Sequence, residues 1–441
     1  MTSSYQRPVT FKNIMRFAIP TIIMSVFTSL YTMIDGLFVS NLIGTQALSS
    51  INLVAPILSL ITAISAMLAT GGSAVIMRKM GEQKAPEAKQ DFTMLILTNV
   101  VIGVVMMILG YLFMDTIFAS MNISPNVLNY CKTYLSHYLL FTIPVLLMYN
   151  FSLYMIAADK SKLSLICSIA GGVTNIVLDY LLIAVLDMGI GGAALATGTG
   201  YSITAIAGLI IFSNKKNLLH FVKPVFRWHT LVKTSTNGIS EMATSLVTGV
   251  VTLMFNAAML KYVGEDGVAA ITIIMYVLMF ACSFYTGYAY GVAPMISYYY
   301  GEDNHDKLRR LIKLSFTFIG SVSILSAIGS FIATPQMVNI FTRPDNPVYD
   351  IAITGNKICS LALLFVGFNI FASGMFTALS NGIVSAALAL SRSFVFMVIA
   401  ISILPLVFGM TGLWFATPFA ECLGLLMAAF FFKRYQKQYR Y

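Results

Sequence analysis

The stretch GLFVSNLIGTQALSSINLVAPILSLITAISAMLATGGSAVIM, residues 36–77, contains no Asp, Glu, Lys or Arg. A second stretch without these residues covers residues 267–301. A membrane helix needs about 20 mostly apolar residues to cross a hydrocarbon core about 30 Å thick. Residues 41–44, Asn-Leu-Ile-Gly, form a turn signal that divides the first stretch between two helices. The sequence therefore predicts an all-α integral membrane protein.

The composition of the whole chain favours the same class. Of its 441 residues, 58% are hydrophobic and only 10% are charged, whereas soluble domains carry about 25% charged residues. The net charge of +10 could indicate a nucleic-acid partner. The basic residues, however, form short clusters between long apolar runs, which is typical of cytoplasmic loops. We expect no nucleic-acid partner, and we expect membrane lipid around the chain.

Turn signals and apolar runs together indicate twelve membrane spans. Their approximate limits are 14–40, 47–79, 90–113, 130–156, 163–186, 190–212, 233–259, 267–299, 310–333, 351–378, 383–407 and 410–432. A cytoplasmic N-terminus places most Lys and Arg residues on one side of the membrane. The opposite side then receives only Lys132, Lys261, Arg343 and Lys357. This bias predicts a multi-pass protein of the inner (plasma) membrane with both termini in the cytoplasm.

The chain matches itself when it is shifted by 220 residues. The shift aligns glycines at turn positions: Gly44 with Gly264, Gly71 with Gly291, Gly81 with Gly301, Gly189 with Gly409 and Gly192 with Gly412. We therefore divide the chain into residues 1–220 and 221–441, each with six spans. An even number of spans gives both halves the same orientation, related by a pseudo-two-fold axis along the membrane normal, as in several transporters.

Particular residues resemble the multidrug and toxic compound extrusion (MATE) family. They are Pro20, residues 35–39 (Asp-Gly-Leu-Phe-Val), residues 71–74 (Gly-Gly-Ser-Ala), residues 175–180 (Asn-Ile-Val-Leu-Asp-Tyr) and residues 189–197. Within this family the chain is most similar to the prokaryotic branch related to DNA-damage-inducible protein F. The resemblance implies two six-helix lobes and export of cationic or amphipathic compounds in exchange for Na⁺ or H⁺.

Polar residues of three predicted spans in the first half lie at a common depth. Asp35, Asp179 and Thr197 agree in depth within about 3 Å at a rise of 1.5 Å per residue. Asn175 precedes Asp179 by one helical turn, and Tyr31 precedes Asp35 by one turn. An acid at membrane depth costs about 2.5–3.5 kcal/mol, which makes a functional role the first hypothesis. These groups suit Na⁺, or a proton held between carboxyls, or a polar network that only fixes helix packing.

The resemblance adds that Asp35, Asn175, Asp179 and Thr197 match the cation site in the first lobe of the family. The 220-residue shift aligns Asp35 with Phe255 and Asp179 with Ile399. We therefore expect the coupling acids to be confined to the first half. No other cofactor is expected.

Four further residues in predicted spans carry separate hypotheses. Glu241 either attracts a cationic substrate into the cavity or extends to the cytoplasmic face. Arg392 and Glu421 lie at similar depth in neighbouring spans, and we expect them to form an ion pair that is structural. Pro20 interrupts the hydrogen bonding of the first span. The resemblance implies a bend there that responds to protonation, and a static kink is the alternative.

No sequence motif indicates an enzyme, because H-E-x-x-H, G-x-S-x-G and P-loop motifs are missing from the chain. Together with the resemblance to the MATE family, this predicts a secondary active multidrug exporter that is monomeric and works by alternating access. Its partners would be cationic or amphipathic drugs. The alternative is a flippase for lipid-linked precursors from the same superfamily. Such a flippase is expected to carry several basic residues in its cavity, and Arg392 is the only one near the middle of a predicted span. A channel or receptor is a more distant possibility.

Overall fold

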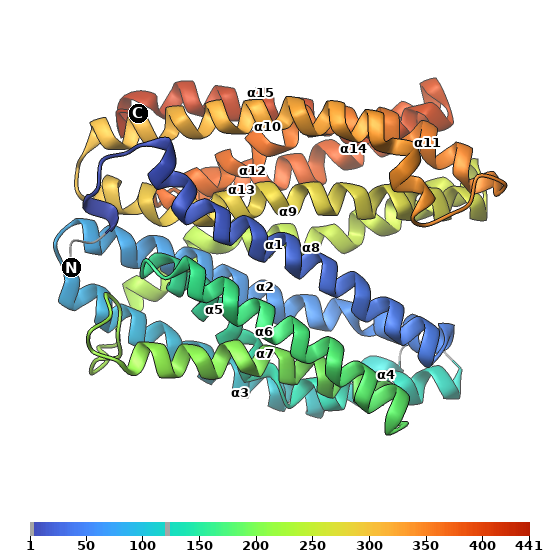
Figure 1. Cartoon of the computed structure of the whole chain (residues 1–441), viewed down its shortest axis with the longest axis horizontal. Coiled ribbons are helices and arrows are strands. Elements are labelled where there is room, and N and C mark those ends of the chain that lie inside the picture. The colour runs from blue at the N-terminus through green and yellow to red at the C-terminus, as the bar shows by residue number, and fades with distance from the viewer. Residues whose placement is uncertain (1–3, 120–123) are drawn as a thin grey trace.

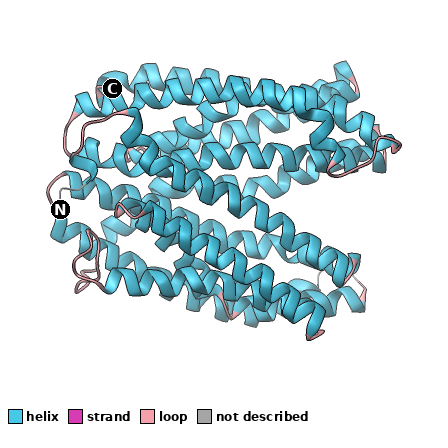
Figure 2. Cartoon of the chain, viewed as in Figure 1, coloured by secondary structure: helices cyan, strands magenta, loops and turns pink. Residues whose placement is uncertain are grey.

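The computed structural model describes residues 4–119 and 124–441, and within these ranges it is a bundle of long helices without a strand (Figure 2). The helices of the first half are α1 Phe11–Leu42, α2 Thr45–Gly81, α3 Ala85–Ala119, α4 Pro125–Leu139, α5 Thr142–Ala157, α6 Ser161–Asp179 and α7 Gly189–Ser213. Those of the second half are α8 Trp228–Tyr262, α9 Glu265–Gly301, α10 His305–Asn339, α11 Pro347–Cys359, α12 Leu363–Ala378, α13 Gly382–Leu390, α14 Phe396–Phe408 and α15 Met410–Tyr439. Short non-α turns are η1 Ser4–Gln6, η2 Tyr180–Val185, η3 Ser360–Ala362 and η4 Ser391–Val395.

The helices form two lobes that follow the two halves of the sequence (Figure 1). The first lobe contains α1 to α7, drawn from blue to green, and the second contains α8 to α15, drawn from yellow-green to red. The lobes meet through two helices each, because α2 packs against α8 and α9, and α1 packs against α9. This arrangement confirms the predicted all-α, two-lobed membrane fold.

Eleven helical segments are long and apolar enough to cross a membrane, and the number rises to twelve if one bent pair counts as a span. That pair is α4 with α5, which are bent by 56° at residues 140–141. The span predicted over residues 130–156 is therefore a bent pair of helices, and the structure has the predicted twelve spans only if this pair counts as one. Its apolar residues continue through the bend, so hydropathy alone carries no sign of it. Several other helices extend beyond their predicted limits. Helix α3, for example, begins at Ala85 rather than near residue 90.

The 220-residue repeat appears in the backbone conformation of the turns. Gly44 and Gly264 have φ of 118° and 90°, and Gly189 and Gly409 have φ of 55° and 56°. These positive values are strained for residues with a Cβ, which explains why glycine stands at both members of each pair. The aligned glycines therefore mark turns that the two lobes build in the same way.

Close backbone contacts join the lobes at the end that carries both termini. A Cβ atom at any of five glycines there would overlap with the backbone of the other lobe: Gly71 with Thr234, Gly238 with Met67, Gly81 with Tyr298, Gly301 with Arg78, and Gly291 with Ala18. The contacts of Gly81 with Tyr298 and of Gly301 with Arg78 are counterparts under the 220-residue shift. The N-terminal segment adds to the closure, because the Tyr5 hydroxyl donates to the Ala157 carbonyl at 2.7 Å and its ring stacks on Tyr298.

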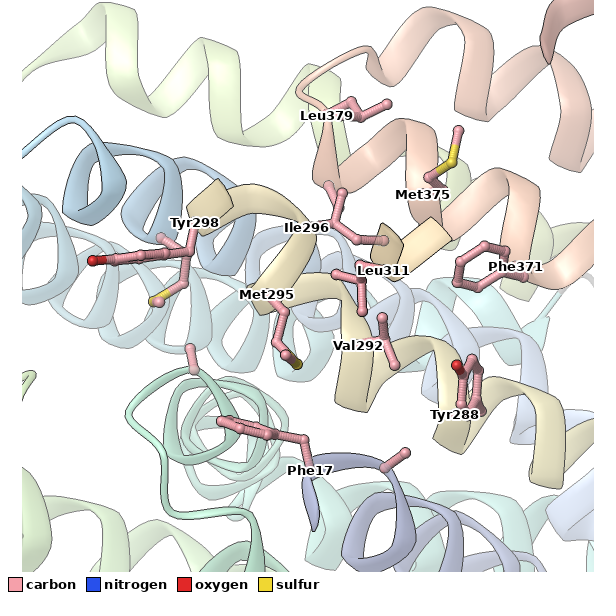
Figure 3. Close-up of a cluster of buried hydrophobic side chains, with 14 of the residues drawn as sticks. Phe17, Tyr288, Val292, Met295, Ile296, Tyr298, Leu311, Phe371, Met375 and Leu379 are labelled. Carbon is pink, nitrogen blue, oxygen red and sulfur yellow. The ribbon is translucent and has the colours of Figure 1, made fainter. Parts of the chain in front are cut away.

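A hydrophobic cluster lies directly beside this closed end (Figure 3). Tyr288, Val292 and Ile296 project from α9 toward residues of α10 and α12, while Met295 points toward Phe17 of α1. Helix α9 is therefore packed on both sides, against its own lobe and against the first helix of the other.

Candidate functional site

The structure brings together the polar residues predicted in the first lobe. Asp35 of α1 lies close to Asp179 and Asn175, which are one turn apart on α6. The Asn175 amide donates to the Thr197 hydroxyl of α7 at 3.4 Å. Asp179 is 0% exposed and Asn175 is 1% exposed. Three helices thus place two carboxyls, an amide and a hydroxyl around one buried point.

The oxygens at this point lack donors. Oδ1 of Asp35, both carboxyl oxygens of Asp179 and Oδ1 of Asn175 are buried and have no hydrogen-bond partner among the described residues. Carboxylate oxygens can only accept, and two of them in contact repel one another in a medium of low dielectric constant. A proton or a cation between the acids would remove both problems, and the oxygen-only donor set fits Na⁺. Residues 4–119 and 124–441 contain no group of three or more His, Cys, Asp or Glu side chains that could hold a metal ion.

A cavity of about 360 Å³ leads to this acid pair. Its lining includes Tyr31, Asn175 and Thr197, whereas Asp35 and Asp179 lie behind these residues. Ions that reach the cavity would therefore meet the amide and the hydroxyl before the carboxyls. Helix α6 changes to the π-helical turn η2 directly after Asp179. Such π turns are frequent at functional sites.

Sequence reasoning missed two tyrosines around the acids. Tyr134 of α4 is buried and lies close to Thr197, and Tyr201 of α7 lies close to Tyr31. The chain has 22 tyrosines, so no single one stands out. Their hydroxyls add groups near the site that can both donate and accept.

A second cavity, of about 610 Å³, lies in the second lobe and contains the other predicted charges. Glu241 of α8 lines it and accepts a hydrogen bond from the Tyr290 hydroxyl of α9 at 3.2 Å. The two cavities share Thr70, Met279 and Tyr290 in their linings, so they adjoin between the lobes.

Arg392 and Glu421 also line the second cavity and form the ion pair expected from their depth. Nη1 of Arg392 lies 2.8 Å from Oε1 of Glu421, and Asn369 donates to Oε2 at 2.6 Å. Arg392 belongs to η4, the second π-helical turn. Its side chain is 14% exposed and that of Glu421 is 7% exposed.

Comparison with known families decides the identity of the fold. The family model described as MatE matches residues 20–181 and, a second time, residues 242–404. The chain belongs to the MATE family. The starts of the two matches, residues 20 and 242, are separated by nearly the 220-residue interval of the internal repeat.

Relatives of this MATE chain cover almost all of its length. The multidrug export protein MepA of Staphylococcus haemolyticus is 25% identical, over 97% of this chain and 94% of that protein. Among solved structures, a MATE protein in complex with MaL6 has a TM-score of 0.92 at 21% identity, over 98% of both chains. An outward-facing multidrug resistance MATE transporter has a TM-score of 0.91 at 21% identity, over 97% of this chain and 96% of that one. At this identity the structures show the fold alone, and the branch within the family stays a prediction.

The two MATE lobes differ in their charges although their scaffolds match. Phe255 and Ile399 occupy the positions equivalent to Asp35 and Asp179. Phe255 is 1% exposed, so an apolar ring fills this place in the second lobe. The described part of the second lobe therefore has no counterpart of the acid pair.

Pro20 lies in the first half of α1, which continues from Phe11 to Leu42 as one α-helix. The proline removes the hydrogen bond that a residue at this position would donate to the carbonyl of Arg16. A bend at Pro20 that responds to protonation stays a prediction for this MATE chain.

Proposed function

We propose that this protein is a secondary active exporter that exchanges cationic or amphipathic organic compounds for H⁺ or Na⁺. The observation that carries the proposal is the pair Asp35 and Asp179, in which three of the four carboxyl oxygens are buried without a donor beside a cavity between the two lobes. Such a pair binds and releases a cation at a cost that depends on its surroundings, as coupling requires. The names of the curated relatives, multidrug export proteins, support the same activity.

Alternating access would link the two events. The lobes are in backbone contact at the end that carries the termini, and the bias of Lys and Arg predicts that this end is cytoplasmic. The structure would then correspond to an outward-facing state in the inner membrane. Binding of H⁺ or Na⁺ at the acids would favour drug release on the outer side, because a ligand shifts a conformational equilibrium only through different affinities for the two states.

The lining of the cavities suits varied amphipathic substrates. Met275, Met279, Tyr276 and Phe255 provide flexible or aromatic apolar surface, while Glu241 offers a negative charge. Methionine-rich surfaces adapt to ligands of different shape. A flippase for lipid-linked phosphates would be expected to have several cations in the cavity, but the described lining has Arg392 alone, paired with Glu421. This lining favours the exporter.

Drug susceptibility tests the proposal. The wild-type chain is expected to raise resistance to cationic dyes and drugs in a bacterial host that lacks its own efflux pumps, and Asp179→Asn is expected to abolish the increase. Asp187→Asn is the matched control, because Asp187 is an exposed acid eight residues further along the chain. Membrane levels of all three proteins would be compared by immunoblot. Wild-type resistance from Asp179→Asn would contradict the role of the acid pair.

A further inference from the structure

The cavity of the second lobe contains two opposite charges that each keep a free polar atom. They are Glu241 on α8 and Arg392 on η4, and both line the same space of about 610 Å³. Once the polar atoms with partners in the protein are identified, the other polar atoms of these two side chains are the ones that can bind a ligand.

On the basic side, the contacts of Arg392 use only part of its guanidinium group. Nη1 donates to Glu421, and Glu421 is satisfied at both oxygens because Asn369 donates to the second one. Nε is enclosed without a partner. Nη2 has no hydrogen-bond partner in residues 4–119 and 124–441 and is not enclosed, so it faces the cavity. A purely structural ion pair would not need to leave this edge of the fork exposed.

On the acidic side, Glu241 is similarly half-satisfied. Oε2 accepts from Tyr290 at 3.2 Å. Oε1 has no donor among the described residues and is not among the enclosed oxygens, so it also faces the cavity. The cavity thus offers one acceptor with negative charge and one donor with positive charge, separated by apolar and hydroxyl-bearing walls.

We infer that this cavity binds zwitterionic amphipathic compounds, with the cationic group at Glu241 and a carboxylate at Nη2 of Arg392. The inference rests on the proposed export function and adds its substrate class. A zwitterion adds no net charge to a buried space, and each of its ends meets a protein charge of opposite sign. A simple cation would use Glu241 alone and leave the guanidinium edge without a partner.

Direct binding to the purified protein in detergent tests this inference with one pair of fluorescent dyes. Rhodamine B carries a cationic ring system and a free carboxylate, and its ethyl ester keeps the cation but lacks the carboxylate. The wild-type protein is expected to bind rhodamine B about tenfold more tightly than the ester, as one charge-assisted hydrogen bond would give. Fluorescence anisotropy gives both dissociation constants.

The double variant Arg392→Gln with Glu421→Gln removes the carboxylate site without leaving a buried charge unpaired. It is expected to bind the two dyes with equal affinity. Glu241→Gln is the second variant. It is expected to weaken the binding of both dyes, while the ratio of their dissociation constants stays as in the wild type. A melting curve checks that each variant is folded.

The outcomes separate this inference from the proposed function. If wild-type protein binds neither dye, the drug-export proposal fails. If it binds both dyes but prefers the ester or shows no preference, export stands and the zwitterion site is wrong. A preference for rhodamine B that persists in the double variant would also overturn the assignment to Arg392.

Discussion

Gly238→Ala is expected to separate the two lobes at the end that carries the termini. Gly238 of α8 is buried against α2, and a Cβ atom there would overlap with the backbone carbonyl of Met67. Carbon and oxygen atoms need roughly 3.5 Å, so the helices must move apart by on the order of 1 Å. A rotamer change cannot relieve this overlap, because the obstacle is backbone.

The size of the effect follows from the cost of overpacking. An added methyl group in a packed contact costs about 1–3 kcal/mol. That cost falls on the closed arrangement alone, so its population relative to a separated arrangement should drop by about 5- to 150-fold. Gly249→Ala, on the same helix, is the control, because nothing lies within 4 Å of a Cβ atom there.

Distances between spin labels would measure the separation. Labels at Lys84 and Asp306, both exposed, report on the loops after α2 and after α9 in a variant without the native cysteines. Gly238→Ala should add or enlarge a population at longer distance, and Gly249→Ala should match the wild type. If Gly238→Ala gives the wild-type distribution in a folded protein, the backbone contact does not hold the lobes together.

Three further results are expected. Reversing the charge of Arg392 or of Glu421 alone should lower the amount of folded protein, because an unpaired buried charge costs about 3–5 kcal/mol. Reversing both charges should restore the amount of folded protein, and failure to do so would count against the pair. Thr197→Val should weaken the apparent affinity for the coupling ion by about tenfold in transport assays, whereas Thr199→Val, whose hydroxyl bonds to its own helix, should not; equal effects would remove Thr197 from the site. Cys282 lines both cavities, so a bound cationic dye should slow its alkylation by a maleimide, with Cys282→Ser as the blank, and an unchanged rate would place the dye elsewhere.

Much of the fold could be predicted because membrane insertion imposes simple rules. The spans could be predicted from the uncharged runs. The repeat could be predicted from the aligned pairs Gly44 with Gly264 and Gly189 with Gly409, because the positive φ at these positions favours glycine. The 56° bend between α4 and α5 could not be predicted, because apolar residues continue through it. The contact of Gly238 with Met67 was also hidden, since it depends on how two lobes dock.

The candidate site was predictable for a different reason. Acids are rare inside spans, so Asp35 and Asp179 stood out, and helical rise placed them at one depth. The surrounding tyrosines did not stand out, because Tyr134 and Tyr201 are two of many. The two π-helical turns, η2 directly after Asp179 and η4 around Arg392, likewise have no known signal in the sequence.

The measurement that tests coupling most directly is dye transport by purified protein in proteoliposomes, with an imposed pH gradient and an imposed Na⁺ gradient applied separately. The wild-type protein should move dye against its concentration gradient with at least one of them, and the effective gradient identifies the ion. Asp35→Asn and Asp179→Asn should insert and fold but show no gradient-driven transport. Normal transport by both variants, or no response of the wild-type protein to either gradient, would contradict coupling at the acid pair.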